Sequence, residues 1–373
     1  MPRRTAASTL VRTAVLAGSV VLVASACTSK GSSTAAPSAT SPAATTAVAP
    51  ATSTAAPATS AAASVKASVA ATNAPPPAPA SVHANELGRV PVLMYHRILE
   101  HPTGDYERSP ADFVADLTYL EKNGFVPITL ADFVAGKIDI PAGKHPVVLT
   151  FDDGTASQFE LVDGKPKAGT AYALMQTFAA AHPDFPAIGS FYVNAAPFGT
   201  RAGEGALAYL TAHGSEVGVH TVHHVLLGSR TDAVVQSEIA DNLAMINSAD
   251  PAQKVTTMAL PFGGRPRTHA LAEKGSSGGT SYDLAGVLAV GANPSHSPYN
   301  ATFDPFYIPR IRAQNVADAK KADQPYISGT WLPQLVADQS SLYTSDGDPA
   351  HVSYPKTTTL QVAPQWKAEA HPY

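Results

Sequence analysis

The chain has 373 residues, of which 45% are hydrophobic and 14% are charged, and its formal net charge is −4. Such a composition supports one large hydrophobic core with additional segments. Basic residues form no block outside the N-terminus, so the sequence argues against nucleic acid as a partner.

Residues 1–26 have the pattern of an export signal. Arginines precede an apolar stretch at 13–23, which is short for a membrane span, and a small-residue cleavage site follows. Cys27 comes next and is the only cysteine, so an internal disulfide is excluded. The run 24–27 resembles a bacterial lipobox, although leucine is usual at its first position. We therefore expect export to the cell surface with a lipid on Cys27 that binds the membrane, and plain secretion is the alternative.

Residues 27–85 are predicted to be a disordered linker. From Thr28 to about Ser81 nearly every residue is Ala, Ser, Thr, Pro or Val. Without large apolar side chains, this segment cannot offset the entropy that ordering would cost. We interpret it as a tether between the anchored cysteine and a folded domain.

The folded domain is expected over residues 86–330, where apolar runs alternate with helical patterns. Ser109, for example, has the position of a helix N-cap, and Pro110 follows at the first helical position. The alternation predicts a parallel α/β fold with its active site at the carboxyl ends of the strands. The predicted strands are 90–95, 147–151, 189–193, 216–220, 256–260 and 286–290, and the predicted helices are 109–124, 170–182, 205–212 and 231–248.

Two of these strands end in side chains that bind metals. The strand 147–151 is followed by Asp152 and Asp153, and another strand ends at His220, with His224 four residues later. Carboxylate and imidazole ligands suit a borderline divalent metal, and three ligands leave a position for water. A spare carboxylate could accept a proton from that water. The pattern predicts a metal-dependent hydrolase; the alternatives are a polar turn and a pair of surface histidines.

The same segments resemble the motifs of a known family. Thr150-Phe151-Asp152-Asp153-Gly154 resembles the first motif of the polysaccharide deacetylases, carbohydrate esterase family 4, which share the chitooligosaccharide-deacetylase homology domain. His220-Thr221-Val222-His223-His224 resembles the second motif, and Leu260-Pro261-Phe262-Gly263 looks like a variant of the third.

The resemblance implies a distorted, incomplete (β/α) barrel with parallel strands. It also implies that Asp152 is the general base and that Asp153, His220 and His224 bind a divalent metal. Zinc is the expected ion, and cobalt, nickel or iron are accepted by related sites. His223 does not match a ligand position.

The third motif departs from the family pattern, in which an arginine that orients the base precedes the Pro-aromatic pair. Ala259 stands at the matching place. Arg310 is a candidate substitute, although the sequence favours an ordinary surface arginine there. The backbone N–H of Phe262, after Pro261, is expected to face a developing oxyanion.

The usual late Leu-x-His motif is absent after Arg312, but His96 ends the first predicted strand. This arrangement resembles the circularly permuted branch of the family, typified by deacetylases of poly-β-1,6-N-acetylglucosamine. His96 would then protonate the departing amine. The alternative is a buried histidine that is bonded to a backbone carbonyl.

Residues 331–373 are expected to be a C-terminal accessory segment of unknown function. The run Asp346-Gly347-Asp348 lacks the further spaced acidic residues and the glutamate that a calcium loop of the EF-hand type requires. Trp331, Tyr343 and Tyr354 could stack on sugar rings, but we expect them to fill the core.

Together these features predict an exported, monomeric, metal-dependent deacetylase. Its expected partner is an acetylated polysaccharide containing N-acetylglucosamine at the cell surface. Two alternatives stay open: an O-acetyl esterase that acts on xylan or another wall polymer, and a non-catalytic glycan-binding lipoprotein.

Overall fold

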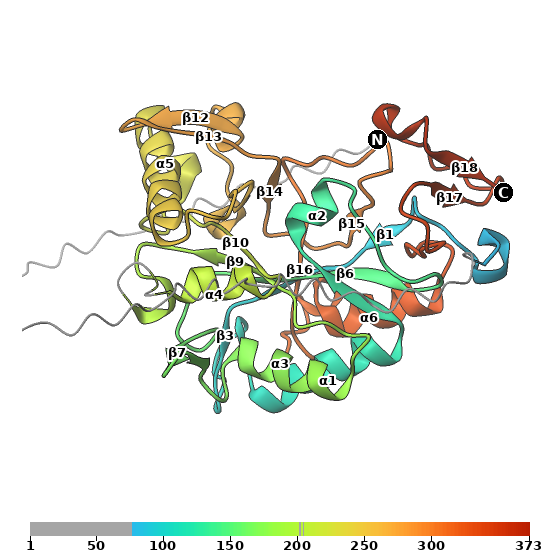
Figure 1. The fold of residues 1–373 in the computed structure, drawn as a ribbon, viewed down its shortest axis with the longest axis horizontal. Coiled ribbons are helices and arrows are strands. Elements are labelled where there is room, and N and C mark those ends of the chain that lie inside the picture. Colours follow the sequence, from blue (N-terminus) through green and yellow to red (C-terminus); the bar gives the residue numbers. More distant parts are fainter. Residues whose placement is uncertain (1–76, 201–202, 204) are drawn as a thin grey trace, which may run out of the picture. The chain divides into compact units, whose positions relative to one another are not determined.

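The computed structural model describes residues 77–200, 203 and 205–373 (Figure 1). The predicted export signal, Cys27 and most of the predicted linker lie outside these residues. The end of that linker prediction is wrong, because Pro79–Val82 form a 3-10 helix and Ala84 and Asn85 are buried against the folded domain. Of the helices that are described, none is both long and apolar enough to cross a membrane.

An eight-stranded sheet forms the centre of the fold, in the order β14-β11-β10-β9-β6-β2-β16, with β5 paired to β6. Its neighbouring strands are all parallel. A parallel bridge also joins Leu288 to Ile308, so the segment 308–312 contacts β14 at one edge and β2 near the other, and the sheet curls. The strands are β2 (Val92–Tyr95), β5 (Phe125–Ile128), β6 (His145–Phe151), β9 (Ser190–Val193), β10 (Glu216–Val219), β11 (Thr257–Ala259), β14 (Gly286–Leu288) and β16 (Ile311–Arg312).

The predicted fold class is confirmed as a curled, incomplete (β/α) barrel, and all six predicted strands are present. The sequence pattern does not predict β5 or β16. Pro127 interrupts the apolar run of β5, and β16 has only two residues, which is too short for an alternation to be recognised.

The four predicted helices are present as α1, α3, α4 and α5. Ser109, Thr170 and Thr231 cap three of them, because each side-chain oxygen accepts a hydrogen bond from the backbone N–H three residues later. The sequence pattern misses α2, which has five residues, and α6, which contains Pro333. The helices are α1 (Pro110–Lys122), α2 (Leu130–Val134), α3 (Ala171–Ala181), α4 (Ala206–Ala212), α5 (Asp232–Ala249) and α6 (Ser328–Ala337).

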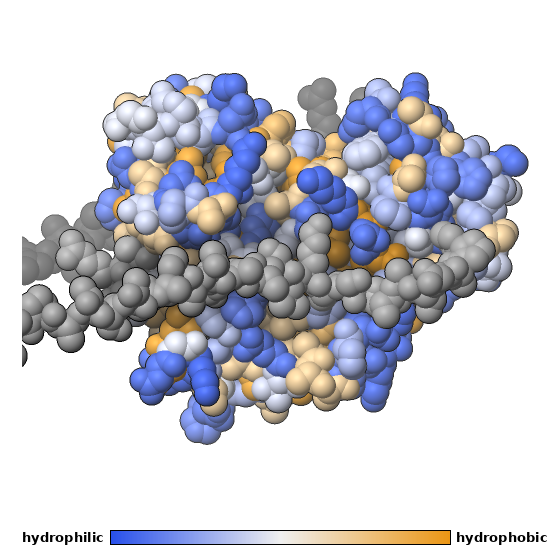
Figure 2. All heavy atoms as spheres, in the orientation of Figure 1, coloured by the Kyte–Doolittle hydropathy of each residue, from blue (hydrophilic) through white to orange (hydrophobic). Residues whose placement is uncertain are grey.

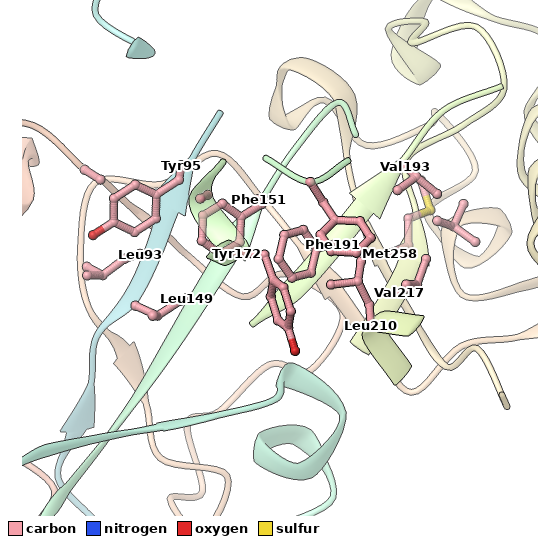
Figure 3. Packing of buried hydrophobic residues seen from close by; sticks show 14 of the residues in the cluster. Leu93, Tyr95, Leu149, Phe151, Tyr172, Phe191, Val193, Leu210, Val217 and Met258 are labelled. Carbon is pink, nitrogen blue, oxygen red and sulfur yellow. The ribbon is translucent and has the colours of Figure 1, made fainter. Parts of the chain in front are cut away.

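Aromatic rings from neighbouring strands form much of the core, which faces α1 and α3 on one side of the sheet (Figures 1 and 3). Phe151 of β6 stacks between Tyr95 of β2 and Phe191 of β9, with ring centroids 5.3 and 4.7 Å away. Phe113 of α1 meets the edge of Tyr95 at 5.1 Å. This packing fixes the register of the three strands, and their carboxyl ends therefore reach the same rim of the barrel.

The C-terminal segment packs against the start of the folded domain. Tyr343 donates its backbone N–H to the carbonyl of Arg89, and Thr344 bonds to Asn85 in the same way. The predicted boundary at residue 330 lies inside α6. The expectation that Trp331, Tyr343 and Tyr354 fill the core is confirmed, since all three belong to or pack against the buried clusters.

Short strand pairs lie outside the sheet. The β12–β13 hairpin packs on α5 (Figure 1), and the face seen in Figure 2 is mainly hydrophilic where it is coloured, with small separate hydrophobic patches. The outer pairs are β1 (Arg89–Val90) with β15 (Ser295–His296), β3 (Arg97–Ile98) with β4 (Glu107–Arg108), β7 (Leu161–Val162) with β8 (Lys165–Pro166), β12 (Lys274–Ser277) with β13 (Thr280–Asp283), and β17 (Val352–Tyr354) with β18 (Ala370–Pro372).

Candidate metal centre and active site

The register of the parallel strands brings the predicted site residues to one rim. Tyr95 of β2 pairs with Phe151 of β6, so His96 and Asp152 follow two neighbouring strands. The backbone N–H of Asp152 donates to the carbonyl of Tyr95 at 3.0 Å. His220 follows β10 in the same direction.

Asp153, His220 and His224 form one cluster whose ligand atoms all lie within 4.8 Å of one another. The Nε2 atoms of His220 and His224 are 3.5 and 3.4 Å from Oδ1 of Asp153. Burial, the largest single effect, raises the pKa of Asp153, but the nearby imidazoles of His220 and His96 together outweigh it and the pKa is lowered. Burial also lowers the pKa of His224, which favours the neutral imidazole that a metal requires.

His220 has a hydrogen-bond pattern that prepares it as a ligand. Its Nδ1 lies 2.8 Å from the carbonyl oxygen of Ala259, and since a carbonyl only accepts, Nδ1 bears the proton. The lone pair is therefore on Nε2, which is buried and has no hydrogen-bond partner among the described residues. An unpartnered buried nitrogen that faces a carboxylate and a second imidazole fits a divalent cation.

The turns that hold the ligands have unusual backbone conformations. Asp153, Thr221 and His224 have φ values of 76°, 63° and 50°, in the left-handed region that non-glycine residues rarely adopt. The side-chain amide of Asn194 donates to the carbonyls of His220 and Thr221 at 2.7 and 2.9 Å, and Oδ1 of Asn242 accepts from the backbone N–H of His220 at 3.0 Å. These bonds hold the second motif in its bent form.

His223 points away from this cluster. Its side chain is 72% exposed, and its Nδ1 and backbone N–H bond to the two carboxylate oxygens of Glu238, at 2.8 and 2.9 Å. It is thus not in the group that could hold a metal, as the motif comparison leads us to expect.

Arg310 forms a two-pronged ion pair with Asp152. Nη1 donates to Oδ1 at 2.6 Å and Nη2 donates to Oδ2 at 2.7 Å, while Nε donates to the carbonyl of Ala289. Burial, the largest single effect, raises the pKa of the Asp152 carboxyl, but the charge and hydrogen bonds of Arg310, with the nearby imidazoles of His220 and His96, together hold the pKa well below its usual range. The expectation of an ordinary surface arginine is wrong, because Arg310 is fully buried and its long side chain runs inside the barrel to the rim.

His96 is partly buried at the end of β2. Its ring packs against Tyr106 with centroids 4.7 Å apart, and Nδ1 has no hydrogen-bond partner among the described residues. Burial lowers the pKa of its imidazole, whereas the charges of Asp152 and Asp153 oppose this shift. The ring therefore lies within the electrostatic reach of both carboxylates.

Phe262 lies beside the metal-ligand cluster. The turn Pro261–Gly263 gives it a φ of 57°, and its ring is 4.6 Å from that of His224. Pro261 is buried, whereas the side chain of Phe262 is 65% exposed. The predicted oxyanion contact of the Phe262 N–H stays a prediction.

The sequence did not predict four residues whose side chains hydrogen-bond to the site residues or to their backbone: Gln158, Asn194, Glu238 and Asn242. Asn194 is the only one that a sequence signal could have suggested, because it directly follows a predicted strand. The others lie within loops or helices and have no motif of their own.

Residues 139–276 match a family model described as "Polysaccharide deacetylase". The chain is 24% identical over 192 residues to YxkH of Bacillus subtilis (strain 168), which bears a polysaccharide deacetylase name; the match covers 49% of this chain and 60% of that protein.

Two solved structures are also similar. IcaB from Ammonifex degensii has 20% identity, coverage of 67% of this chain and 96% of that chain, and a TM-score of 0.46. BA3943 from Bacillus anthracis, described as a CE4 family pseudoenzyme, has 17% identity, coverage of 33% and 37%, and a TM-score of 0.24.

Proposed function

Because this chain contains a polysaccharide deacetylase domain over residues 139–276, we propose that it is a metal-dependent deacetylase. Its substrate in this proposal is an N-acetylglucosamine-containing polysaccharide, from which it removes N-acetyl groups. The main support is the position of Asp152, an ionised buried carboxylate whose Oδ2 is 4.0 Å from Nε2 of His220, a nitrogen without a hydrogen-bond partner among the described residues. A proton acceptor thus lies beside a complete set of metal ligands.

The residues present fit a divalent cation, which Asp153, His220 and His224 would hold. When bound, it would supply Lewis-acid polarisation of the acetyl carbonyl and of the attacking water. Two imidazoles and one carboxylate favour zinc on ligand grounds, with cobalt, nickel or iron as alternatives.

The chain's own groups then divide the proton transfers. Asp152 takes a proton from water, and Arg310 keeps this carboxylate ionised and fixed in orientation. The Phe262 N–H donates to the oxygen that becomes negative when the water adds to the carbonyl. His96 gives a proton to the nitrogen of the sugar as the C–N bond breaks, which leaves acetate and an amine.

The position of His96 at the end of the first barrel strand supports membership of the circularly permuted branch. We also propose export with a lipid on Cys27, followed by a tether that ends before the folded residues that start near Pro79. Replacement of Cys27 by serine should move the protein from the membrane fraction to the medium; an unchanged membrane fraction would contradict the lipid.

An O-acetyl esterase would use the same metal ligands and base, whereas a glycan-binding lipoprotein would need the metal ligands at most and not the base Asp152. The buried Arg310–Asp152 pair favours catalysis over binding, because a buried ion pair is costly to keep without a use for its charge. The family contains pseudoenzymes, so activity itself has to be measured.

The experiment is acetate release from four substrates: chitin oligomers, β-1,6-linked N-acetylglucosamine oligomers, peptidoglycan and acetyl-xylan. We expect release from an N-acetylated glycan, abolished by chelation and reduced about 10²–10⁴-fold by Asp152→Asn. Release from acetyl-xylan alone would favour the esterase. The same rate in wild type and Asp152→Asn would exclude Asp152 as the base.

A further inference from the structure

Gln158 connects the ends of the two strands that present Asp152 and His96. It is fully buried in the loop after β6. Its Nε2 donates to the carbonyl of His96 at 2.7 Å and also to the carbonyl of Asp152. One side-chain amide thus bonds to the backbone of both residues to which we assign proton transfer.

This bond extends the pairing of β2 and β6 beyond the end of the sheet. Regular pairing ends at Tyr95 and Phe151, and the last backbone bond runs from Asp152 N–H to Tyr95. The neighbouring Ser157 accepts a hydrogen bond from the backbone N–H of Ile98 at 3.1 Å. The segment 157–158 therefore holds the chain at His96 and two residues after it, while the bond from Asp152 to Tyr95 holds it just before His96.

The side-chain oxygen of Gln158 indicates that stability alone does not explain a glutamine at this position. Its Oε1 is buried and has no hydrogen-bond partner among the described residues. An unsatisfied buried acceptor costs about 1–3 kcal/mol. The residue provides a two-proton donor at this place although its oxygen has no protein partner among the described residues, so its amide is used to hold the two carbonyls.

His96 depends on such backbone support. Its Nδ1 has no partner in the described part of the chain, so no side-chain hydrogen bond at that atom orients the ring. The direction of the imidazole is set by its backbone and by packing on Tyr106. A shift of about 1 Å in such a group is enough to slow catalysis about 100-fold.

We propose that Gln158 is a positioning residue that fixes the separation of Asp152 and His96. It acts through the two carbonyls and touches no reacting atom. This inference rests on the proposed function, because it takes Asp152 as the base and His96 as the acid.

The test combines Gln158→Leu with His96→Ala in a double-mutant cycle. We expect Gln158→Leu to lower kcat for an N-acetylglucosamine oligomer about 10–100-fold, with KM and metal content unchanged. In the His96→Ala background the same change should cost less than about twofold, because the residue that it positions is gone. Gln176→Leu, which alters a half-buried glutamine on α3, is the matched control and should be neutral.

Equal losses from Gln158→Leu in both backgrounds, or no loss in the wild-type background, would overturn the inference. A crystal structure of Gln158→Leu provides a readout that needs no activity and also shows whether the variant folds. We expect the carbonyls of His96 and Asp152 to move apart; unchanged positions would overturn the positioning role. Failure of the wild type to release acetate from any glycan would instead overturn the proposed function.

Discussion

Arg310 reaches Asp152 across 158 positions of sequence and binds both of its carboxylate oxygens in the barrel interior. The guanidinium also donates to Oγ1 of Thr150 and to the carbonyl of Ala289, so its orientation is fixed from three sides. In the proposed function Arg310 takes the role that the family pattern gives to an arginine at the position of Ala259. The ion pair leaves Asp152 as a carboxylate with a lowered pKa and a fixed orientation.

Substitution of Arg310 should therefore change the pH dependence of the reaction. In Arg310→Lys the two-pronged geometry is lost, and in Arg310→Met burial acts on Asp152 without the charge that opposes it most, so the pKa of Asp152 should rise. We expect the acidic limb of the kcat/KM profile against pH to move to higher pH, and to move further in Arg310→Met than in Arg310→Lys. Arg265→Lys, at an exposed pair with Asp304, is the control.

The same substitutions should affect stability. Removal of one partner of a buried ion pair costs about 3–5 kcal/mol, so urea denaturation should show a loss of this order for Arg310→Met. If Arg310→Met has the same pH profile and the same urea stability as Arg265→Lys, the Arg310–Asp152 pair has no role in either property.

Metal binding should depend on three residues and not on the histidine between them. Asp153→Ala and His220→Ala remove ligand atoms of the cluster and should lower the metal content, measured by elemental analysis of the purified protein, to below about a tenth of wild type. His223→Ala is the matched control, because this imidazole bonds to Glu238 instead. Full metal occupancy in the first two variants would exclude the proposed centre.

His96→Ala should separate two kinds of substrate. An amine is a poor leaving group without a proton, whereas an activated ester with a good leaving group needs none. We expect a fall of about 10²-fold or more in kcat for the N-acetylated oligomer, and a change within about threefold for the ester. If both substrates lose activity equally, His96 is not the acid.

Protein stability should fall as pH rises from about 5 to 8, because of Glu86 at the start of the folded domain. Burial first, and then the nearby Asp346, raises the pKa of Glu86 from 4.5 to about 8. The folded state keeps a proton that the unfolded chain releases above pH 4.5, so the contribution is complete below that value and is lost as pH approaches 8. The slope from this group is at most about 1.4 kcal/mol per pH unit.

Urea denaturation at several pH values should show this slope in the wild type and a flatter one in Glu86→Gln. Glu160→Gln, at an exposed pair with Lys167, should keep the wild-type slope. Parallel slopes in all three proteins would assign the pH dependence to other groups.

The strands and the metal ligands were accessible to sequence reasoning because both have local signals. Apolar runs mark the strands, and parallel strands place everything that follows them at one rim, so Asp153 and His220 are expected together despite the distance between them. Caps such as Ser109 mark helices in the same local way.

The supporting contacts have no such signals. The partner of His220 is the backbone carbonyl of Ala259, which any residue would provide. Arg310 looks like a surface residue because its sequence neighbours do not show that the chain returns to the interior of the barrel there. Gln158 and Asn194 bond to backbone carbonyls, and the identity of their partners is set only by the three-dimensional fold.

The conformation of Thr221 has a consequence for how this protein could be engineered. A β-branched residue with a φ of 63°, and with a buried Oγ1 that lacks a partner among the described residues, is poorly suited to its place. Glycine would fit that backbone better, but it would also make the turn between His220 and His224 more flexible. A glycine selected there for heat resistance alone would loosen the two imidazoles of the candidate metal centre relative to each other. Stability and the geometry of this cluster therefore have to be screened together when the loop is changed.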